Sequence, residues 1–273
     1  MRKSLVIAAA LAVLPLPAAA QTPATPPAPL ELSAEQRQML ETAVARGRAL
    51  FVLDQVYRSA SSDARARVPA ADAEAITGWI AQPEGNGVTV TYYVRDGENY
   101  AAIYKAAVIG GRVSSPQVFA AASRPRLEGA ALRMAAARTA AEAAPHQACG
   151  PDFNTFVLPP VEGQPVAVYR LSPRMAANRV PGGGHFRLAI AGDGSIAEDV
   201  TLGGGTCADL TVPAVAAGRR ATPIRVNAAG MPLPNELHVF LSLWTQRPLA
   251  VAAGTDSVRV WGVTGEGIAE LRQ

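Results

Sequence analysis

Two of the three histidines, together with one glutamate, are the residues whose types could support acid–base or metal chemistry. His185 and His238 both lie in predicted strands, and Glu236 is two residues before His238. Because side chains two apart on a strand point to the same face, we expect Glu236 and His238 to share a face. Imidazole and carboxylate groups suit zinc and similar ions, and histidine is a common general acid or base. One hypothesis is therefore a metal-dependent or acid–base hydrolase that uses His185, His238 and Glu236.

The alternative is that these histidines serve only the fold, in which case we expect no metal and no cofactor. Local signatures of several enzyme classes are absent from the sequence. Lys105 is the only lysine besides Lys3, and it follows Tyr104, so there is neither a Gly-Lys-Ser/Thr phosphate loop nor a Ser-x-x-Lys nucleophile. Gly-x-Ser-x-Gly, His-Glu-x-x-His and Cys-x-x-Cys are also missing. The leading hypothesis is a non-catalytic module that binds a small molecule or a component of the cell envelope.

Three further residues are candidates for binding a ligand. Asp54 lies one turn after Leu50 and close to Tyr57, on the apolar face of the first predicted helix. An unpaired buried carboxylate is costly, so Asp54 must be hydrogen-bonded or lie at the rim of a cleft. Asp54, Tyr57 and Trp79 could form a pocket with a polar anchor. The ordinary alternative is an aspartate paired with an arginine or a backbone amide, beside aromatic residues of the core.

The first twenty residues have the pattern of a Sec-type signal peptide. Arg2 and Lys3 supply positive charge, an apolar run extends to Leu16, and three alanines precede Gln21. Two prolines keep the apolar run well short of the about 20 residues that cross a bilayer. We therefore predict that residues 1–20 are removed, that the protein is periplasmic, and that no membrane span is left.

The charge of the chain argues against a nucleic-acid partner. The 273 residues include 25 basic and 22 acidic side chains, a formal net charge of +3. Arg2 and Lys3 belong to the predicted signal peptide, so 23 basic residues remain and the net charge falls to +1. Such a small charge, without a run of basic residues, gives no general field that would attract nucleic acid.

Two cysteines, Cys149 and Cys207, are the only ones in the chain. An even number of cysteines in an exported protein favours a disulfide, since the periplasm is oxidising. Two free buried thiols are the alternative. We predict a bridge between Cys149 and Cys207.

Hydrophobic periodicity divides the chain beyond the signal peptide into three segments. Residues 21–32 are a proline-rich flexible leader. Residues 33–144 are predicted as a helix that begins at a capping box, a three-stranded meander and an alanine-rich second helix. Residues 145–273 are mainly β, either as a second domain or as part of one continuous domain. The predicted fold class is α+β, with two helices on an antiparallel meander followed by a mainly antiparallel β portion.

The predicted elements follow from these periods. The first region is expected to contain a helix from residue 33 to about 60, a helical or irregular connector at 69–82, strands near 88–94, 100–109 and 112–119, and a helix within 126–144. The second region is expected to contain strands at 153–158, 166–171, 185–191, 195–202, 237–243, 249–252 and 258–263.

Four stretches resemble segments of uncharacterised exported proteins of Gram-negative bacteria. They are 50–63 (LFVLDQVYRSASSD), 78–93 (GWIAQPEGNGVTVTYY), 153–173 (FNTFVLPPVEGQPVAVYRLSP) and 183–188 (GGHFRL). The resemblance spans most of the chain beyond the signal peptide. It implies residence in the periplasm and says nothing about an activity.

Overall fold

A computed structural model describes residues 31–97, 99–174, 176, 178–204, 206–215, 218, 221–255 and 257–271. The predicted signal peptide and most of the proline-rich leader lie outside the described residues. The chain from residue 33 onward clusters into one compact unit. As predicted, the fold is α+β, with two helices on an antiparallel meander followed by a mainly antiparallel β portion. Within the described residues, none of the helices has both the length and the apolar character needed to cross a bilayer.

Helix α1 (Ala34–Arg67) begins at the predicted capping box. The Gln36 amide donates to Ser33 Oγ over 3.1 Å, and the Ser33 amide donates to Gln36 Oε1 over 2.9 Å, so two otherwise unpaired N–H groups are satisfied. The helix extends seven residues beyond the predicted end near residue 60. It stops at Val68, which is extended because Pro69 follows and disfavours a helical conformation there.

The first sheet has four strands in the order β1-β2-β3-β4, all antiparallel: β1 (Gly78–Glu84), β2 (Gly87–Asp96), β3 (Asn99–Ile109) and β4 (Arg112–Val118). The three predicted strands correspond to β2, β3 and β4, but β1 was missed, because residues 69–82 were predicted as a helical or irregular connector. That segment contains the short helix α2 (Ala70–Ala73) and then β1. The first four residues of β1 are all buried, so the strand has no alternating pattern to reveal it.

The β portion divides into three sheets. One is antiparallel, in the order β5-β6-β8-β9, and a two-stranded sheet pairs β10 with β7. In the third, order β11-β12-β13-β14, only β11 and β12 are parallel. The strands are β5 (Asn154–Val157), β6 (Val166–Leu171), β7 (Arg179–Pro181), β8 (His185–Ile190), β9 (Ile196–Leu202), β10 (Asp209–Thr211), β11 (Ile224–Ala229), β12 (Leu249–Gly254), β13 (Arg259–Val263) and β14 (Ile268–Glu270).

Residues 237–243, predicted as a strand, belong instead to helix α4 (Glu236–Thr245). This helix is buried on nearly every side, so its apolar run carries no 3.6-residue period that would distinguish it from a strand. It packs closely on α1 at Gly47, where an added Cβ would lie 2.5 Å from the Val239 Cβ atom. The glycine therefore permits the two helix backbones to approach.

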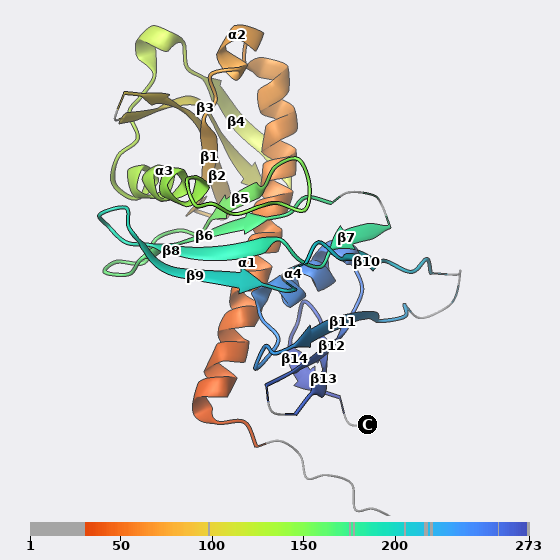
Figure 1. Cartoon of the computed structure of the whole chain (residues 1–273). Coiled ribbons are helices and arrows are strands. Elements are labelled where there is room, and N and C mark those ends of the chain that lie inside the picture. Colours follow the sequence, from red (N-terminus) through yellow and green to blue (C-terminus); the bar gives the residue numbers. More distant parts are fainter. Residues whose placement is uncertain are drawn as a thin grey trace, which may run out of the picture. The chain divides into compact units, whose positions relative to one another are not determined.

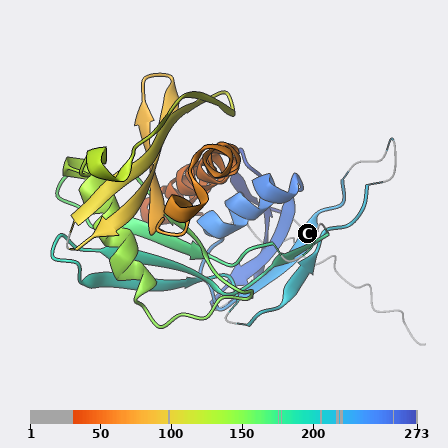
Figure 2. The same ribbon diagram turned by 90° about the horizontal axis from the view of Figure 1, so that it is seen from above.

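Helix α3 (Gly129–Glu142) joins the first sheet to the second. It packs against β1 on one side and against β5, β6 and β8 on the other. Met134 and Ala135 on α3 share a buried cluster with Ile80 of β1 and Val168 of β6. The cartoons show α1 running beside the first sheet and continuing past α4, with α3 between the two sheets (Figures 1 and 2). A short 3-10 turn, η1 (Ala121–Ser123), leads from β4 toward α3.

Candidate functional sites

His185 is wholly buried at the start of β8, and both of its ring nitrogens bond the backbone. Its Nδ1 accepts from the Ser172 amide over 3.1 Å, which leaves the proton on Nε2 to donate to the Pro181 carbonyl over 3.0 Å. Burial lowers the pKa of His185 to about 4. This histidine is therefore neutral, and it joins the residue after β6 to the end of β7.

His238 lies on α4, so the expectation that it shares a strand face with Glu236 was wrong. Residues two apart on a helix are about 200° apart around its axis and point away from each other. The His238 Nδ1 accepts from the Asn235 amide over 3.1 Å as part of the helix cap. Burial, with a smaller effect of His185, lowers the pKa of His238 to about 4. Its buried Nε2 has no hydrogen-bond partner among the described residues.

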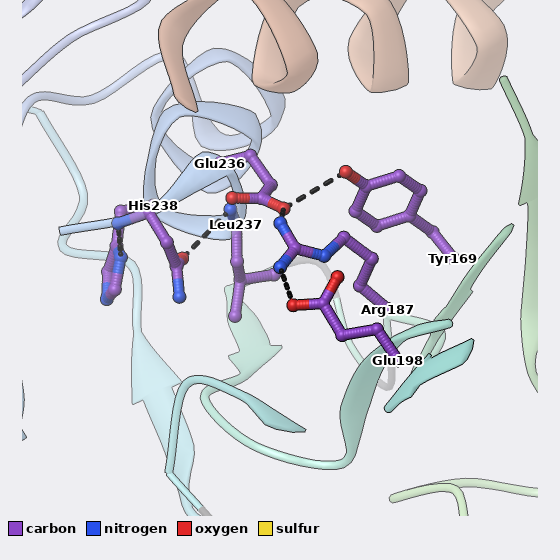
Figure 3. A network of polar contacts seen from close by, with 7 residues as sticks. Tyr169, Arg187, Glu198, Glu236, Leu237 and His238 are labelled. Carbon is purple, nitrogen blue, oxygen red and sulfur yellow. Dashed lines mark hydrogen bonds and ion pairs between the residues drawn. The ribbon is translucent and has the colours of Figure 1, made fainter. Parts of the chain in front are cut away.

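Glu236 is the centre of a buried polar network (Figure 3). Its Oε1 accepts from the Tyr169 hydroxyl over 3.0 Å and from Arg187 Nη1 over 2.9 Å, and Arg187 Nη2 bonds Glu198 over 3.1 Å. Burial alone would lower the pKa of Arg187, but the Glu236 and Glu198 carboxylates more than offset it and raise that pKa. Burial, and then the Glu236 charge, raise the pKa of the Tyr169 hydroxyl. The Arg187 guanidinium is thus paired with two carboxylates, one buried and one exposed.

His185 and His238 are close enough to interact electrostatically, but their rings hydrogen-bond different backbone groups. His185 accepts from the Ser172 amide, and His238 accepts from the Asn235 amide. Glu236 is committed to Tyr169 and Arg187. Across the residues that the structure describes, no three histidine, cysteine, aspartate or glutamate side chains are placed to hold one metal ion. The hydrogen bond of His238 caps α4, and the bonds of Glu236 to Tyr169 and Arg187 hold α4 against the second sheet.

The predicted disulfide is confirmed: Cys149 and Cys207 are bridged, with their Cα atoms 5.3 Å apart. Ser172 supports the bridge, since its Oγ accepts from the Cys149 amide over 2.8 Å and donates to the Gly184 carbonyl over 2.7 Å. Gly184 has a φ of +68°, and an added Cβ would collide with the Cys149 sulfur. The glycine before His185 is therefore required both for its conformation and for the space it leaves.

Asp54 is buried and paired, as the ordinary alternative predicted. Its Oδ2 accepts from Arg58 Nε over 2.8 Å, one helical turn further along α1, and the Arg58 side chain extends into solvent. Asp54 does not line the cavity that its neighbour Tyr57 borders.

Tyr57 and Trp79 do come together, at a cavity of about 90 Å³ between α1, β1, α3 and β5, here called the aromatic pocket. Their rings stack with centroids 5.0 Å apart, and Trp79 meets Phe156 edge-on at 5.9 Å. The lining residues are Tyr57, Trp79, Arg138, Phe153, Asn154, Thr155 and Phe156.

The polar side chains that line the aromatic pocket differ in whether they already have hydrogen-bond partners. Arg138 is already engaged, because Nη1 donates to the Thr155 carbonyl over 2.9 Å and Nε lies 2.8 Å from a Glu142 oxygen. The half-buried amide of Asn154, by contrast, has no hydrogen-bond partner among the described residues. The pocket thus combines aromatic side chains with a lining whose exposed surface is more polar than apolar, and the Asn154 amide can both donate and accept hydrogen bonds.

Sequence reasoning missed Arg138 and residues 153–156 as lining residues. They belong to α3, to β5 and to the residue just before β5, which reach Tyr57 and Trp79 only through the packing of two sheets on one helix. The one local signal was the pair of aromatic residues that flanks Asn154 and Thr155 shortly after Cys149.

Comparison with known proteins found no matching family model, no matching curated protein and no matching solved structure.

Proposed function

We propose that the protein is a non-catalytic binding module whose ligand places a small amide-bearing group in the aromatic pocket. The observation that carries the proposal is the Asn154 side chain, which has no hydrogen-bond partner among the described residues and lines a cavity together with four aromatic residues: Tyr57, Trp79, Phe153 and Phe156. Binding sites commonly combine apolar walls with a few polar groups that fix orientation. A polar group in a half-buried site gains most when a ligand supplies its hydrogen bonds.

The size of the pocket limits the group that enters it. A cavity of about 90 Å³ holds roughly three waters at about 30 Å³ each, and is smaller than the about 150 Å³ apolar cavity that accepts benzene. An acetamido group fits this space: its methyl packs against the rings, and its N–H and C=O pair with Asn154. The rest of an N-acetylated sugar would then lie outside, beside the half-buried face of Tyr57.

The alternative, a hydrolase that uses His185, His238 and Glu236, has less support. A general acid or base works best with a pKa near the working pH and with access to substrate. The two histidines are at most 1% exposed and have pKa values of about 4, and Glu236 is 4% exposed. We therefore assign all three to the fold.

We propose in addition that the protein is located in the periplasm. The signal-peptide pattern of residues 1–20 and the disulfide are both typical of exported proteins. N-terminal sequencing of protein from the native host tests this: we expect the chain to begin at Gln21 in the periplasmic fraction. A chain that retains Met1 would contradict export.

Calorimetric titration with N-acetylglucosamine tests the proposed function. We expect saturable binding that is lost with glucosamine, which has no acetyl group. Asn154→Leu should abolish binding, because leucine fills the pocket and removes the amide, whereas Asn178→Leu, at an exposed position away from the pocket, should leave it unchanged. Equal binding of the two sugars, or equal binding by Asn154→Leu, would contradict the proposal.

A further inference from the structure

A second cavity, here called the arginine pocket, lies where β2 ends and β3 begins. Its volume is about 300 Å³, and its charged lining residues are Arg95, Asp96, Arg124 and Arg126. Arg95 and Asp96 end β2, whereas the other two arginines come from the loop between η1 and α3. The cavity is several times larger than the aromatic pocket and shares no lining residue with it.

Two of the guanidinium groups are held in place by bonds that use only part of their donor capacity. Arg124 Nη2 donates to Asp72 Oδ1 over 2.8 Å, which joins α2 to the loop before α3. Arg95 Nε donates to the Gly97 carbonyl over 3.0 Å within the β2–β3 turn. Each arginine has five N–H donors, so most of them are still available to a ligand.

Arg126 is positioned by its backbone. The residues on either side of it bond β3: the Pro125 carbonyl accepts from the Ala102 amide, and the Leu127 amide donates to the Tyr100 carbonyl, both over 2.8 Å. This loop therefore extends the edge of the sheet and holds Arg126 opposite Ala101. The side chain of Arg126 is exposed and has no hydrogen bond or ion pair among the described residues.

Among the described residues, arginines outnumber carboxylates at the arginine pocket. Three arginines line it, together with one described acidic residue, Asp96, and Asp72 is the partner of Arg124. Within the described part of the chain, neither Arg95 nor Arg126 forms an ion pair with a carboxylate. The whole chain carries a formal charge of only +3, so this excess of guanidinium groups in one cavity is a local feature.

We propose that the arginine pocket binds a phosphate group, either as free inorganic phosphate or as part of a small phosphate monoester. Guanidinium groups present paired N–H donors that match the oxygens of phosphate, and three of them suit the several oxygens of a tetrahedral anion better than the two of a carboxylate. Asp96 accepts the hydrogen of hydrogen phosphate, or of a hydroxyl next to the ester. This site is separate from the aromatic pocket and does not depend on the proposed function.

Calorimetric titration of the whole protein with inorganic phosphate and with glycerol 3-phosphate, at constant ionic strength, tests the inference. We expect one saturable site for at least one of the two; the tighter ligand distinguishes a free ion from a monoester. Arg126→Gln should weaken binding by about tenfold or more, and Arg126→Lys by less, because lysine keeps the charge but loses the planar pair of donors. Arg133→Gln, at an exposed arginine of α3 outside the pocket, is the matched control and should bind as the wild type does.

Three outcomes would overturn the inference. The first is that neither phosphate shows saturable binding. The second is that Arg126→Gln and Arg133→Gln lose equal affinity for phosphate. The third is that citrate binds more tightly than either phosphate. Since Arg126 is exposed, its variants should melt at the wild-type temperature. A second variant, Arg95→Gln, must also weaken the binding of phosphate.

Discussion

The Glu236 network and the arginine pocket both bring arginines and carboxylates together, but they differ in what is left unpaired. In the network, Arg187 bonds two carboxylates, and one of them belongs to Glu236, a buried residue at the start of α4. In the arginine pocket, three guanidinium groups line a cavity and only Arg124 has an ionic partner among the described residues. Charges that satisfy one another stabilise a fold, whereas donors left free around a cavity are available to a ligand.

The largest effect is expected where the network loses its buried carboxylate. Glu236→Ala leaves Arg187 in a largely buried position without its inner partner and removes the acceptor of the Tyr169 hydroxyl. We expect the free energy of unfolding to fall by about 3–5 kcal/mol. Glu198→Ala is the matched control, because it removes the other carboxylate of Arg187 at a 53% exposed site and should cost at most about 1 kcal/mol. Urea unfolding measures both, and equal losses would contradict the distinction.

A smaller loss is expected from His238→Ala. The change removes a buried ring and the acceptor of the Asn235 amide, so we expect a loss of about 1–3 kcal/mol. Melting curves of both proteins with and without a chelator provide the test, and the chelator should change neither. A chelator that lowers the midpoint of the wild type alone would reveal a stabilising metal at His238.

The two buried histidines predict a dependence of stability on pH. Their pKa values rise from about 4 in the folded protein to the ordinary 6.5 in the unfolded chain. Between these values the unfolded chain binds more protons, so the free energy of unfolding falls as the pH drops from 6.5 toward 4. The slope should reach about 1.4 kcal/mol per pH unit for each histidine. Denaturation at several pH values measures it, and His238→Asn, which keeps an acceptor for the Asn235 amide, should remove part of the slope; an unchanged slope would contradict its origin.

The smallest effect is expected in the arginine pocket. Arg126→Gln removes an exposed charge that has no partner in the described structure, so stability without ligand should change by less than about 0.5 kcal/mol. Urea unfolding in a phosphate-free buffer checks this value. A loss as large as that of Glu236→Ala would show that Arg126 supports the fold and would remove the contrast between the two sites.

The sequence alone predicted helices and strands correctly wherever a segment had a clear hydrophobic period or a capping motif. The capping box of Ser33 and Gln36 located the start of α1, and the alternation of residue types in β2 located the β2–β3 hairpin. Where a segment is buried on all sides, the period disappears: β1 was taken for a connector and α4 for a strand.

Neither cavity could be derived from local sequence. Tyr57 and Trp79 were candidates, but Asn154 reaches them only because β5 packs near α1 and β1. The arginines at positions 95, 124 and 126 form no basic run, so net charge and charge runs gave no sign of their convergence. Such sites depend on contacts between distant segments.

The close packing of α1 against α4 at Gly47 also constrains the order of events during synthesis. Helix α1 is made first, but Val239, which covers it there, follows about 190 residues later, and contacts at such separation form slowly. Until then the surface of α1 around Gly47 lacks its cover from α4. Apolar surface exposed in this way is prone to aggregation until the last quarter of the chain has been made.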